Sequence, residues 1–292
     1  MTPTLRCLLA ALVAALPLAA SAQPATEADT RNPLLFAMDD EDSRVYLFGS
    51  VHVLNADAYP LPADVEAAYA DAEALAFELD MTNLAAIQGA VMTRAQYTDG
   101  RTLREAIGDS LFTQLEAVLQ TFGAPVAAFN GFEPWAVQLT LAGLATQALG
   151  YDAQNGVDLH FTTRAQADGK PISGLETADD QMDIFDGMPE TQQIAMLVQF
   201  IDEWDQMGAQ FDALLTAWET GSDEHIAALM NDLPEGSRDA LLRDRNAAWV
   251  PQIEALLSGS EDVLVVVGAG HLAGDDSVVA MLREKGYTLT RL

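Results

Sequence analysis

Cysteine is almost absent from this sequence: the single example, Cys7, precedes an apolar run near the amino terminus. Because we expect this segment to be removed as a leader, the mature chain should carry no thiol. Disulfide bonds, cysteine nucleophiles and thiolate metal ligands are then excluded. A bound metal ion would depend on His, Asp, Glu, Asn or backbone oxygen for its ligands.

Long hydrophobic segments are also missing, apart from the leader. Residues 1–22 carry the positive charge of Arg6 near their start, continue with an apolar run over residues 8–18 and end in an Ala-Ser-Ala cleavage motif, as secretory leaders do. The run is shorter than the ~20 residues that a spanning helix needs, which disfavours an uncleaved anchor. Cys7 precedes the run, which disfavours a lipoprotein. We expect residues 23–292 to be a single domain, periplasmic or secreted, without stable membrane insertion.

Basic residues are few: 14 Lys and Arg stand against 44 Asp and Glu, which gives a net charge of −30. Such a surface repels nucleic acids and anionic membranes, so binding to either is disfavoured. The charge can attract cationic peptides, although an acidic solvated surface is the simpler explanation.

Several catalytic signatures are absent as well. The sequence contains no H-E-x-x-H helix, no G-x-S-x-G elbow and no P-loop, which disfavours a zincin, a serine hydrolase of the α/β type and a nucleotide-binding protein. Gly268-Ala269-Gly270 resembles the start of a dinucleotide-binding motif, but His271 and Gly274 break the spacing.

Short apolar runs bounded by glycine or polar residues predict an α/β fold with a mostly parallel, mixed sheet built from both ends of the chain. A hairpin partner for the first run and a final strand complete the sheet. The four main runs are Arg44–Val53, Ala74–Met81, Lys170–Ala178 and Asp262–Leu272; the hairpin partner is Phe36–Met38 and the final strand Gly286–Leu292.

Helical patterns fill the intervals between the predicted strands. The helical insertions cover about 82–168 and 178–260, and we expect them to cap the crevice above the strand ends. Thr102 and Glu105 have the spacing of a capping box. The predicted helices begin near Leu61, cover Trp135–Leu149 and Arg238–Leu257, and include one long helix between Pro189 and Thr220.

Two of the four histidines occupy the same kind of position. Gly49-Ser50-Val51-His52 and Gly268-Ala269-Gly270-His271 each follow an apolar strand and precede a predicted helix. A glycine at the end of a strand allows a sharp turn, so the histidine three residues later can face the crevice where α/β sheets bind ligands. The repeat also suggests an internal duplication of a β-GxxH-α unit.

A carboxylate, Glu78, lies near the end of another predicted strand, where burial is costly unless the charge is paired or ligating. Together with His52 and His271 it would form a two-histidine, one-carboxylate set suited to Zn²⁺, Mn²⁺, Fe²⁺ or Co²⁺. The alternative is structural: Glu78 forms a salt bridge with an arginine, and the histidines cap loops.

The ordered motifs GSVHVL, YPLP-x-DVE, FELD, GVDLHF, GKPISGLET, RDRNAAWVPQI and VVVGAGHLAGDDSV together resemble the GumN branch of the TraB/Tiki superfamily. The resemblance covers residues 33–292 and implies a fold similar to erythromycin-esterase-like and ChaN-like proteins. The hallmark histidines and glutamate of that superfamily match His52, His271 and Glu78. Because animal Tiki proteins are metal-dependent proteases, the resemblance implies that activity. Other relatives are linked to pheromone shutdown or polysaccharide gene clusters without a clear reaction.

Three further residues join the candidate site, and the resemblance raises Arg245 above an ordinary surface arginine. Glu176 ends the third strand and can orient a histidine, with structural pairing as the alternative. Arg245, beside Asn246 in RDRN on a predicted helix, can hold a carboxylate or stabilise an oxyanion.

The remaining motif residues carry weaker expectations. Asp158 is expected to cap a helix or orient a ligand. His160 and His225 fit packed or exposed positions, and we assign them no role.

These observations leave three hypotheses open. The first is a metal-dependent hydrolase of amide or peptide bonds, in which His52, His271 and Glu78 hold the ion and Arg245 stabilises negative charge. The second is a metal-independent, esterase-like hydrolase with a His base oriented by Glu78. The third is a non-catalytic protein that binds a metal, haem or a peptide.

Overall fold

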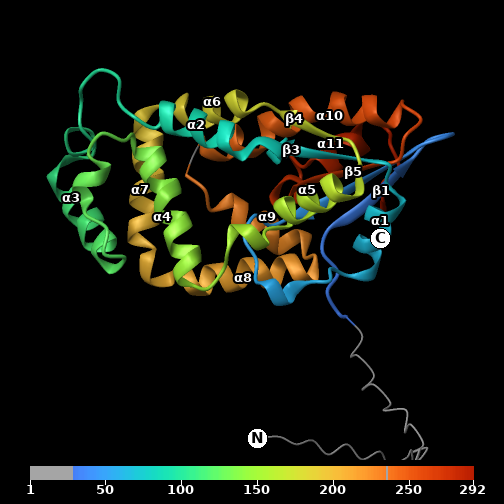
Figure 1. Cartoon of the computed structure of the whole chain (residues 1–292), viewed down its shortest axis with the longest axis horizontal. Helices are drawn as coiled ribbons and strands as arrows, with labels where there is room; N and C mark the ends of the chain where they lie inside the picture. Colours follow the sequence, from blue (N-terminus) through green and yellow to red (C-terminus); the bar gives the residue numbers. More distant parts are fainter. Residues whose placement is uncertain (1–28, 235) are drawn as a thin grey trace, which may run out of the picture. The chain divides into compact units, whose positions relative to one another are not determined.

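A six-stranded sheet with the order β4-β3-β5-β2-β1-β6 organises residues 31–292 (Figure 1). The computed structural model describes residues 29–234 and 236–292, so the expected leader lies outside the described residues. The strands are β1 Leu35–Asp39, β2 Arg44–Ser50, β3 Ala74–Leu79, β4 Ile172–Glu176, β5 Val263–Gly268 and β6 Thr290–Arg291.

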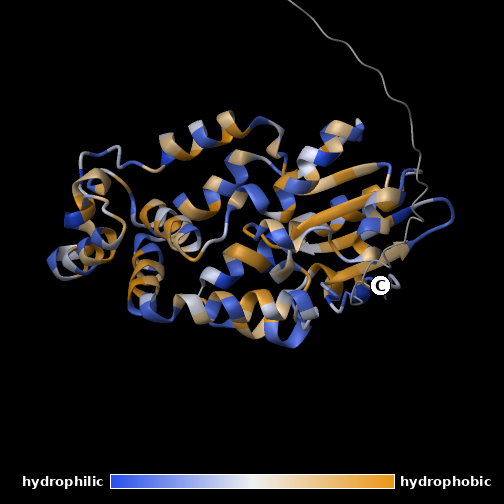
Figure 2. Ribbon diagram, turned by 60° about the horizontal axis from the view of Figure 1, so that its bottom comes forward, coloured by the Kyte–Doolittle hydropathy of each residue, from blue (hydrophilic) through white to orange (hydrophobic). Residues whose placement is uncertain are grey.

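The sheet is mixed, and its four adjacent strands β4, β3, β5 and β2 are parallel. β2 pairs with β5, β5 with β3 and β3 with β4 in parallel, whereas β1 is antiparallel to both β2 and β6. The predicted α/β fold and the β1–β2 hairpin are therefore confirmed. The strands are also the most continuously hydrophobic segments in Figure 2, and residues 263–267 of β5 are all buried, so both faces of the sheet are covered.

The described residues contain eleven α-helices. They are α1 Ala63–Asp71, α2 Leu84–Arg94, α3 Leu103–Thr121, α4 Pro134–Ala148, α5 Val157–Asp168, α6 Ala178–Asp186, α7 Glu190–Asp202, α8 Met207–Thr220, α9 Asp223–Asn231, α10 Asp244–Leu257 and α11 Val278–Glu284. The predicted capping box is present at the start of α3, where Thr102 and Glu105 exchange hydrogen bonds. None of the helices in the described part of the chain combines the length and hydropathy needed to span a membrane.

The connections between the parallel strands run along the sheet in one direction as far as β4 and then in the opposite direction. The chain crosses from β2 to β3 through α1 and from β3 to β4 through α5, but returns from β4 to β5 through α10. Right-handed crossovers in opposite directions place their helices on opposite faces of a sheet. The neighbouring strands β2 and β5 therefore send their following helices, α1 and α11, to opposite faces. Such a switch point opens a crevice beyond the strand ends, where α/β proteins bind ligands.

A second hydrophobic cluster lies away from the sheet. Its fully buried members are Leu103, Leu115 and Leu119 of α3, Val137 and Leu141 of α4, and Leu197 of α7. Figure 1 shows these three helices together at the end of the unit opposite the strands.

Two sequence-based expectations are corrected, and a third is not confirmed. The predicted long helix between Pro189 and Thr220 is two helices, because a 3₁₀ turn at Trp204–Gln206 separates α7 from α8. The final strand is only Thr290–Arg291. The internal duplication is not confirmed: a loop and a 3₁₀ turn separate His52 from α1, whereas His271 lies within a 3₁₀ turn.

Candidate active site

The candidate residues meet around Gly268, the last residue of β5. Its backbone N–H donates to Oε1 of Glu78 on β3 at 2.7 Å. A Cβ atom at Gly268 would lie 3.2 Å from Glu78 Oε1, 3.7 Å from His52 Nε2 and 3.7 Å from His271 Cδ2. The structure thus brings His52, Glu78 and His271 together at the switch point between β2 and β5, where a side chain at position 268 would crowd Glu78 and touch both histidines.

Arg245 on α10 binds two buried carboxylates at this site. Its Nη2 donates to Glu78 Oε2 at 2.6 Å and to Glu176 Oε2 at 2.8 Å, and its Nε donates to Glu176 Oε1 at 2.9 Å. Its Nη1 donates to the carbonyl of Leu241 and to His271 Nε2, both at 3.1 Å. All five guanidinium protons therefore have acceptors. The salt bridge that the structural alternative required for Glu78 is present, and its partner is Arg245.

Burial opposes the ionised form of Glu78, whose side chain is only 9% exposed. The charge of His271, which is protonated only at the low pH where Glu78 titrates, and that of Arg245 act together with the Gly268 N–H, outweigh burial and lower the pKa of Glu78 to about 2. Glu78 is consequently a carboxylate at every physiological pH.

His271 is held as a neutral ring in one orientation. Asn246 Nδ2 donates to the carbonyl of Asp276 at 2.7 Å, which turns Asn246 Oδ1 toward His271 Nδ1 at 2.6 Å. The proton is therefore assigned to Nδ1, and Nε2 is left as an acceptor. Burial is the largest influence on the ring and lowers its pKa to about 4. Asn246 thus fixes the orientation and the tautomer of His271, as hydrogen-bond partners of catalytic or metal-ligating histidines do.

His52 has the opposite character. Its Nδ1 contacts Asp158 Oδ2 at 2.9 Å, and the other oxygen of Asp158 accepts from Ser50 Oγ at 2.9 Å. The Asp158 charge is the main influence and raises the pKa of His52 to about 9. The His52 side chain is 66% exposed, while that of Asp158 is 8% exposed. A buried carboxylate therefore orients an open imidazole, whose Nε2 is directed toward Gly268.

Gly156 makes the His52–Asp158 contact possible. It precedes α5, and its backbone passes so close to the loop after β2 that a Cβ atom there would lie 2.1 Å from the carbonyl oxygen of His52. Only glycine fits this approach, which delivers Asp158 in the first turn of α5 to its partner. Asp158 therefore orients His52, and the helix-capping alternative is wrong because Gly156 occupies the cap position.

We expect the two site histidines to titrate far apart. In nitrogen-15 NMR of the imidazole rings, His52 should lose its proton near pH 9 and His271 should stay neutral down to about pH 4. The folded-state pKa of His52 lies above the usual value of about 6.5. The pairing of His52 with Asp158 therefore stabilises the fold fully below about pH 6.5, and this stabilisation is lost as the pH rises through 9.

Asp158→Asn removes the charge and should lower the pKa of His52 toward its ordinary value. The His225 resonance serves as an internal control, because this exposed residue lies on α9 and its Nδ1 contacts Ser222 Oγ. A His52 that titrates near pH 6.5 in both proteins would contradict the assigned pairing.

The donor set has the chemistry of a site for a borderline divalent cation. Each candidate histidine has its Nδ1 bound by an oxygen and its Nε2 directed inward, and Glu78 Oε1 lies 3.6 Å from His271 Nε2. This orientation by outer hydrogen bonds is typical of metal-ligating histidines. Within residues 29–234 and 236–292, however, no three His, Asp or Glu side chains are already grouped closely enough to hold an ion. The guanidinium of Arg245 contacts two of the three candidate ligands, His271 and Glu78. Binding of a cation by these side chains therefore requires Arg245 to give up both contacts.

The remaining predicted residues fall outside this cluster or act through Arg245. Glu176 binds Arg245, which in turn contacts His271. His160 on α5 stacks on Tyr59 with 4.1 Å between ring centroids, and the backbone N–H of His225 is capped by Ser222.

Two residues that support the site were not predicted from the sequence. Ser50 holds Asp158 from within the first GxxH motif, and Trp249 packs its ring 4.4 Å from that of His271 and under the guanidinium of Arg245. Trp249 follows Arg245 by four residues on a helix, a spacing that predicts a shared face.

Comparisons with known proteins agree with the motifs. The TraB/PrgY/gumN family model matches residues 34–291. The chain is 26% identical over 239 residues to the uncharacterised protein YbaP of Escherichia coli strain K12, a match that covers 82% of this chain and 87% of YbaP. It is 22% identical over 199 residues to the metalloprotease TIKI homolog of Amphimedon queenslandica, covering 59% of this chain and 39% of that protein. No solved structure matches the chain.

Proposed function

The chain belongs to the TraB/PrgY/gumN family, and from this premise we propose that it is a hydrolase whose active site contains His52, Glu78 and His271. The observation that carries the proposal is the convergence of these three side chains on Gly268, each histidine oriented through its Nδ1. Amide or peptide bonds are the proposed substrate class, because a relative is described as a metalloprotease. The leader expected from the sequence would direct this action to the periplasm or outside the cell.

In the preferred version, Nε2 of His52, Nε2 of His271 and the Glu78 carboxylate hold a divalent cation, with Mn²⁺, Co²⁺, Zn²⁺ and Fe²⁺ as candidates. Such an ion, when bound, supplies a water of lowered pKa and polarises the scissile carbonyl. His52 must lose its Nε2 proton before it can donate a lone pair, whereas His271 is already neutral.

Glu78 and Arg245 supply the remaining functions. As a carboxylate at neutral pH, Glu78 can accept a proton at Oε2 once Arg245 Nη2 releases that oxygen. The released N–H of Arg245 is then a donor for negative charge that develops on the substrate. Glu176 keeps the guanidinium at the site throughout, because it holds Nε as well as Nη2.

A second version needs no cation and is favoured by one observation: Arg245 already satisfies His271 Nε2 and Glu78 Oε2. Here the exposed His52, oriented by Asp158, is the base: in the molecules in which its Nε2 has lost its proton, that nitrogen accepts a proton from water, and Arg245 stabilises the resulting charge. Asp158 takes the orienting role that the sequence had assigned to Glu78.

The versions separate in one experiment. The purified protein is incubated with a mixture of capped peptides after EDTA treatment and again after each cation is restored, and new amino termini are detected by mass spectrometry. We expect cleavage that stops with EDTA and returns with one cation. Cleavage unaffected by EDTA would select the version without a cation. No cleavage under any condition would contradict the hydrolase and leave a binding protein.

A further inference from the structure

A cavity of about 620 Å³ lies among α4, α7, α8 and α9, outside the candidate active site. Its volume is in the range of sites that bind drug-sized ligands. Most of its wall is apolar, with three methionines and two phenylalanines: Met196, Met207, Met230, Phe200 and Phe211. Methionine side chains are flexible and polarisable, so such a wall adapts to apolar groups of different shapes.

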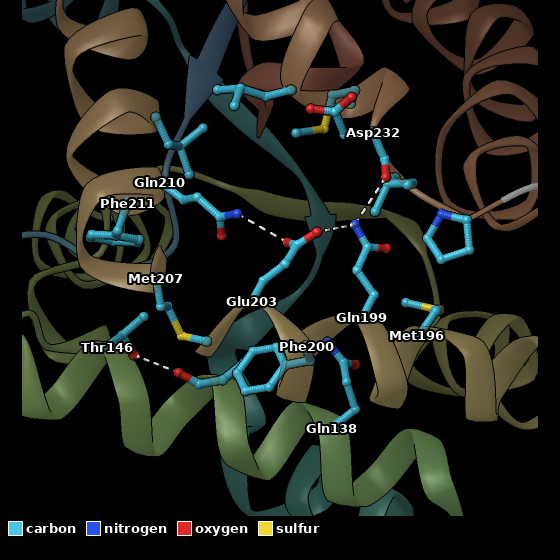
Figure 3. A pocket seen from close by; sticks show the side chains of 16 residues that line it. Gln138, Thr146, Met196, Gln199, Phe200, Glu203, Met207, Gln210, Phe211 and Asp232 are labelled. Atoms are coloured by element: carbon cyan, nitrogen blue, oxygen red, sulfur yellow. Dashed lines mark hydrogen bonds between the residues drawn. The ribbon is translucent and has the colours of Figure 1, made fainter. Parts of the chain in front are cut away.

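Among the described residues, every charged side chain that lines this cavity is acidic. Glu203 and Asp232 contribute carboxylates, and no Lys, Arg or His of the described chain contributes to the lining. Figure 3 shows the Glu203 carboxylate between two neutral amides: Gln199 Nε2 donates to Oε1 at 3.0 Å and Gln210 Nε2 donates to Oε2 at 3.0 Å. These amides fix the position of the carboxylate without neutralising its charge. In a protein of net charge −30, the cavity therefore favours a cationic group beside its apolar wall.

The cavity shares a wall with the loop that carries His271. The side chain of Met230 lies so close to Gly270 that a Cβ atom there would be 2.8 Å from Met230 Sδ and 3.2 Å from Cγ. Gly270 directly precedes His271, and only glycine allows Met230 to pack this closely. A ligand that contacts Met230 inside the cavity is therefore separated from the His271 loop by one side chain.

We propose that this cavity binds a peptide segment in which an apolar or aromatic side chain neighbours a basic one, with the apolar group on the methionine wall and the cation at Glu203. The inference that this segment belongs to the substrate rests on the proposed function, whereas the binding itself does not.

The test is isothermal titration calorimetry of the purified protein in EDTA with two capped tripeptides, acetyl-Phe-Lys-Leu-amide and acetyl-Phe-Glu-Leu-amide. We expect the lysine peptide to bind at least about tenfold more tightly, and Glu203→Gln to weaken its binding about tenfold, because a hydrogen-bonded ion pair becomes a neutral contact. Asp212→Asn is the matched control: Asp212 is exposed on α8 and does not line the cavity, so its removal should leave the affinity unchanged.

A second variant blocks the space itself. Ala142 of α4 lines the cavity, and Ala142→Phe should abolish binding of the lysine peptide while circular dichroism shows an intact fold. His52→Ala should keep the binding, which separates this inference from the hydrolase proposal. Equal affinities for the two peptides, or an unchanged affinity in Glu203→Gln, would overturn the proposal. Binding of octylammonium without binding of either peptide would overturn it as well, because the cavity would then select a small amphiphilic amine.

Discussion

Arg245→Ala should lower the free energy of unfolding by about 3–5 kcal/mol, the usual cost of removing one partner from a buried ion pair. The Arg245 side chain is 12% exposed, and those of Glu78 and Glu176 are each 9% exposed. The substitution would leave two carboxylates facing each other with little access to water. Urea denaturation followed by circular dichroism measures the change.

Arg243→Ala is the matched control for this prediction. Arg243 lies two residues earlier, is 45% exposed, and pairs with the exposed Asp239 and Asp244. Exposed pairs contribute only about 0–1 kcal/mol, so this variant should be close to wild type. Glu176→Gln added to Arg245→Ala should recover part of the loss, since one unpaired charge is removed. Equal free energies of unfolding for the two arginine variants would show that Glu78 and Glu176 do not depend on Arg245 to offset their buried charge.

His52→Ala should reduce peptide cleavage by roughly 10²–10⁴-fold, the range associated with removal of a general base, and by more if the residue also holds a cation. The fold should stay intact but lose some stability, because the His52 side chain is 66% exposed while the buried Asp158 loses its charged partner and keeps only Ser50. Initial rates on the most readily cleaved peptide of the mixture provide the measurement.

His225→Ala controls for the loss of any histidine, since His225 contacts only its neighbour Ser222 among the hydrogen bonds described for its side chain. Its rate should equal that of wild type. A His52→Ala variant that is folded and retains full activity would remove His52 from the active site.

The sequence predicts the strand ends well, for a physical reason. Parallel strands buried on both faces must be continuously apolar, so the polar residue that ends each run marks the carboxyl edge of the sheet. Glu78, Glu176 and the two GxxH histidines are all found this way, and the parallel arrangement of β2, β3, β4 and β5 makes them neighbours.

Side-chain partners could not be predicted in the same way. Glu78 and Arg245 are 167 positions apart, and nothing in the local pattern distinguishes Arg245 from Arg243 as the buried residue. The approach of Gly156 to the backbone of His52 is equally invisible, because it depends on how α5 packs beside β2.

The break between α7 and α8 shows the limit of periodicity. Apolar residues continue at helical spacing from Leu197 to Trp218, since both helices turn an apolar side inward. The turn at Trp204–Gln206 keeps that spacing while it changes the direction of the chain. A pattern of burial therefore predicts which residues face inward but not where two consecutive helices part. The same turn contributes to the cavity, because Glu203 and Met207 flank it.

The most direct test of the site is thermal unfolding of the EDTA-treated protein with Mn²⁺, Co²⁺, Zn²⁺ or Fe²⁺ added singly, in wild type, His52→Ala and His225→Ala. A cation that binds only the folded state, present at a hundred times its Kd, should add about 2.7 kcal/mol of stability. The account predicts that one cation raises the Tm of wild type and of His225→Ala and leaves His52→Ala unchanged. An equal rise in all three proteins would place the ion elsewhere, and no rise with any cation would contradict the metal-dependent site.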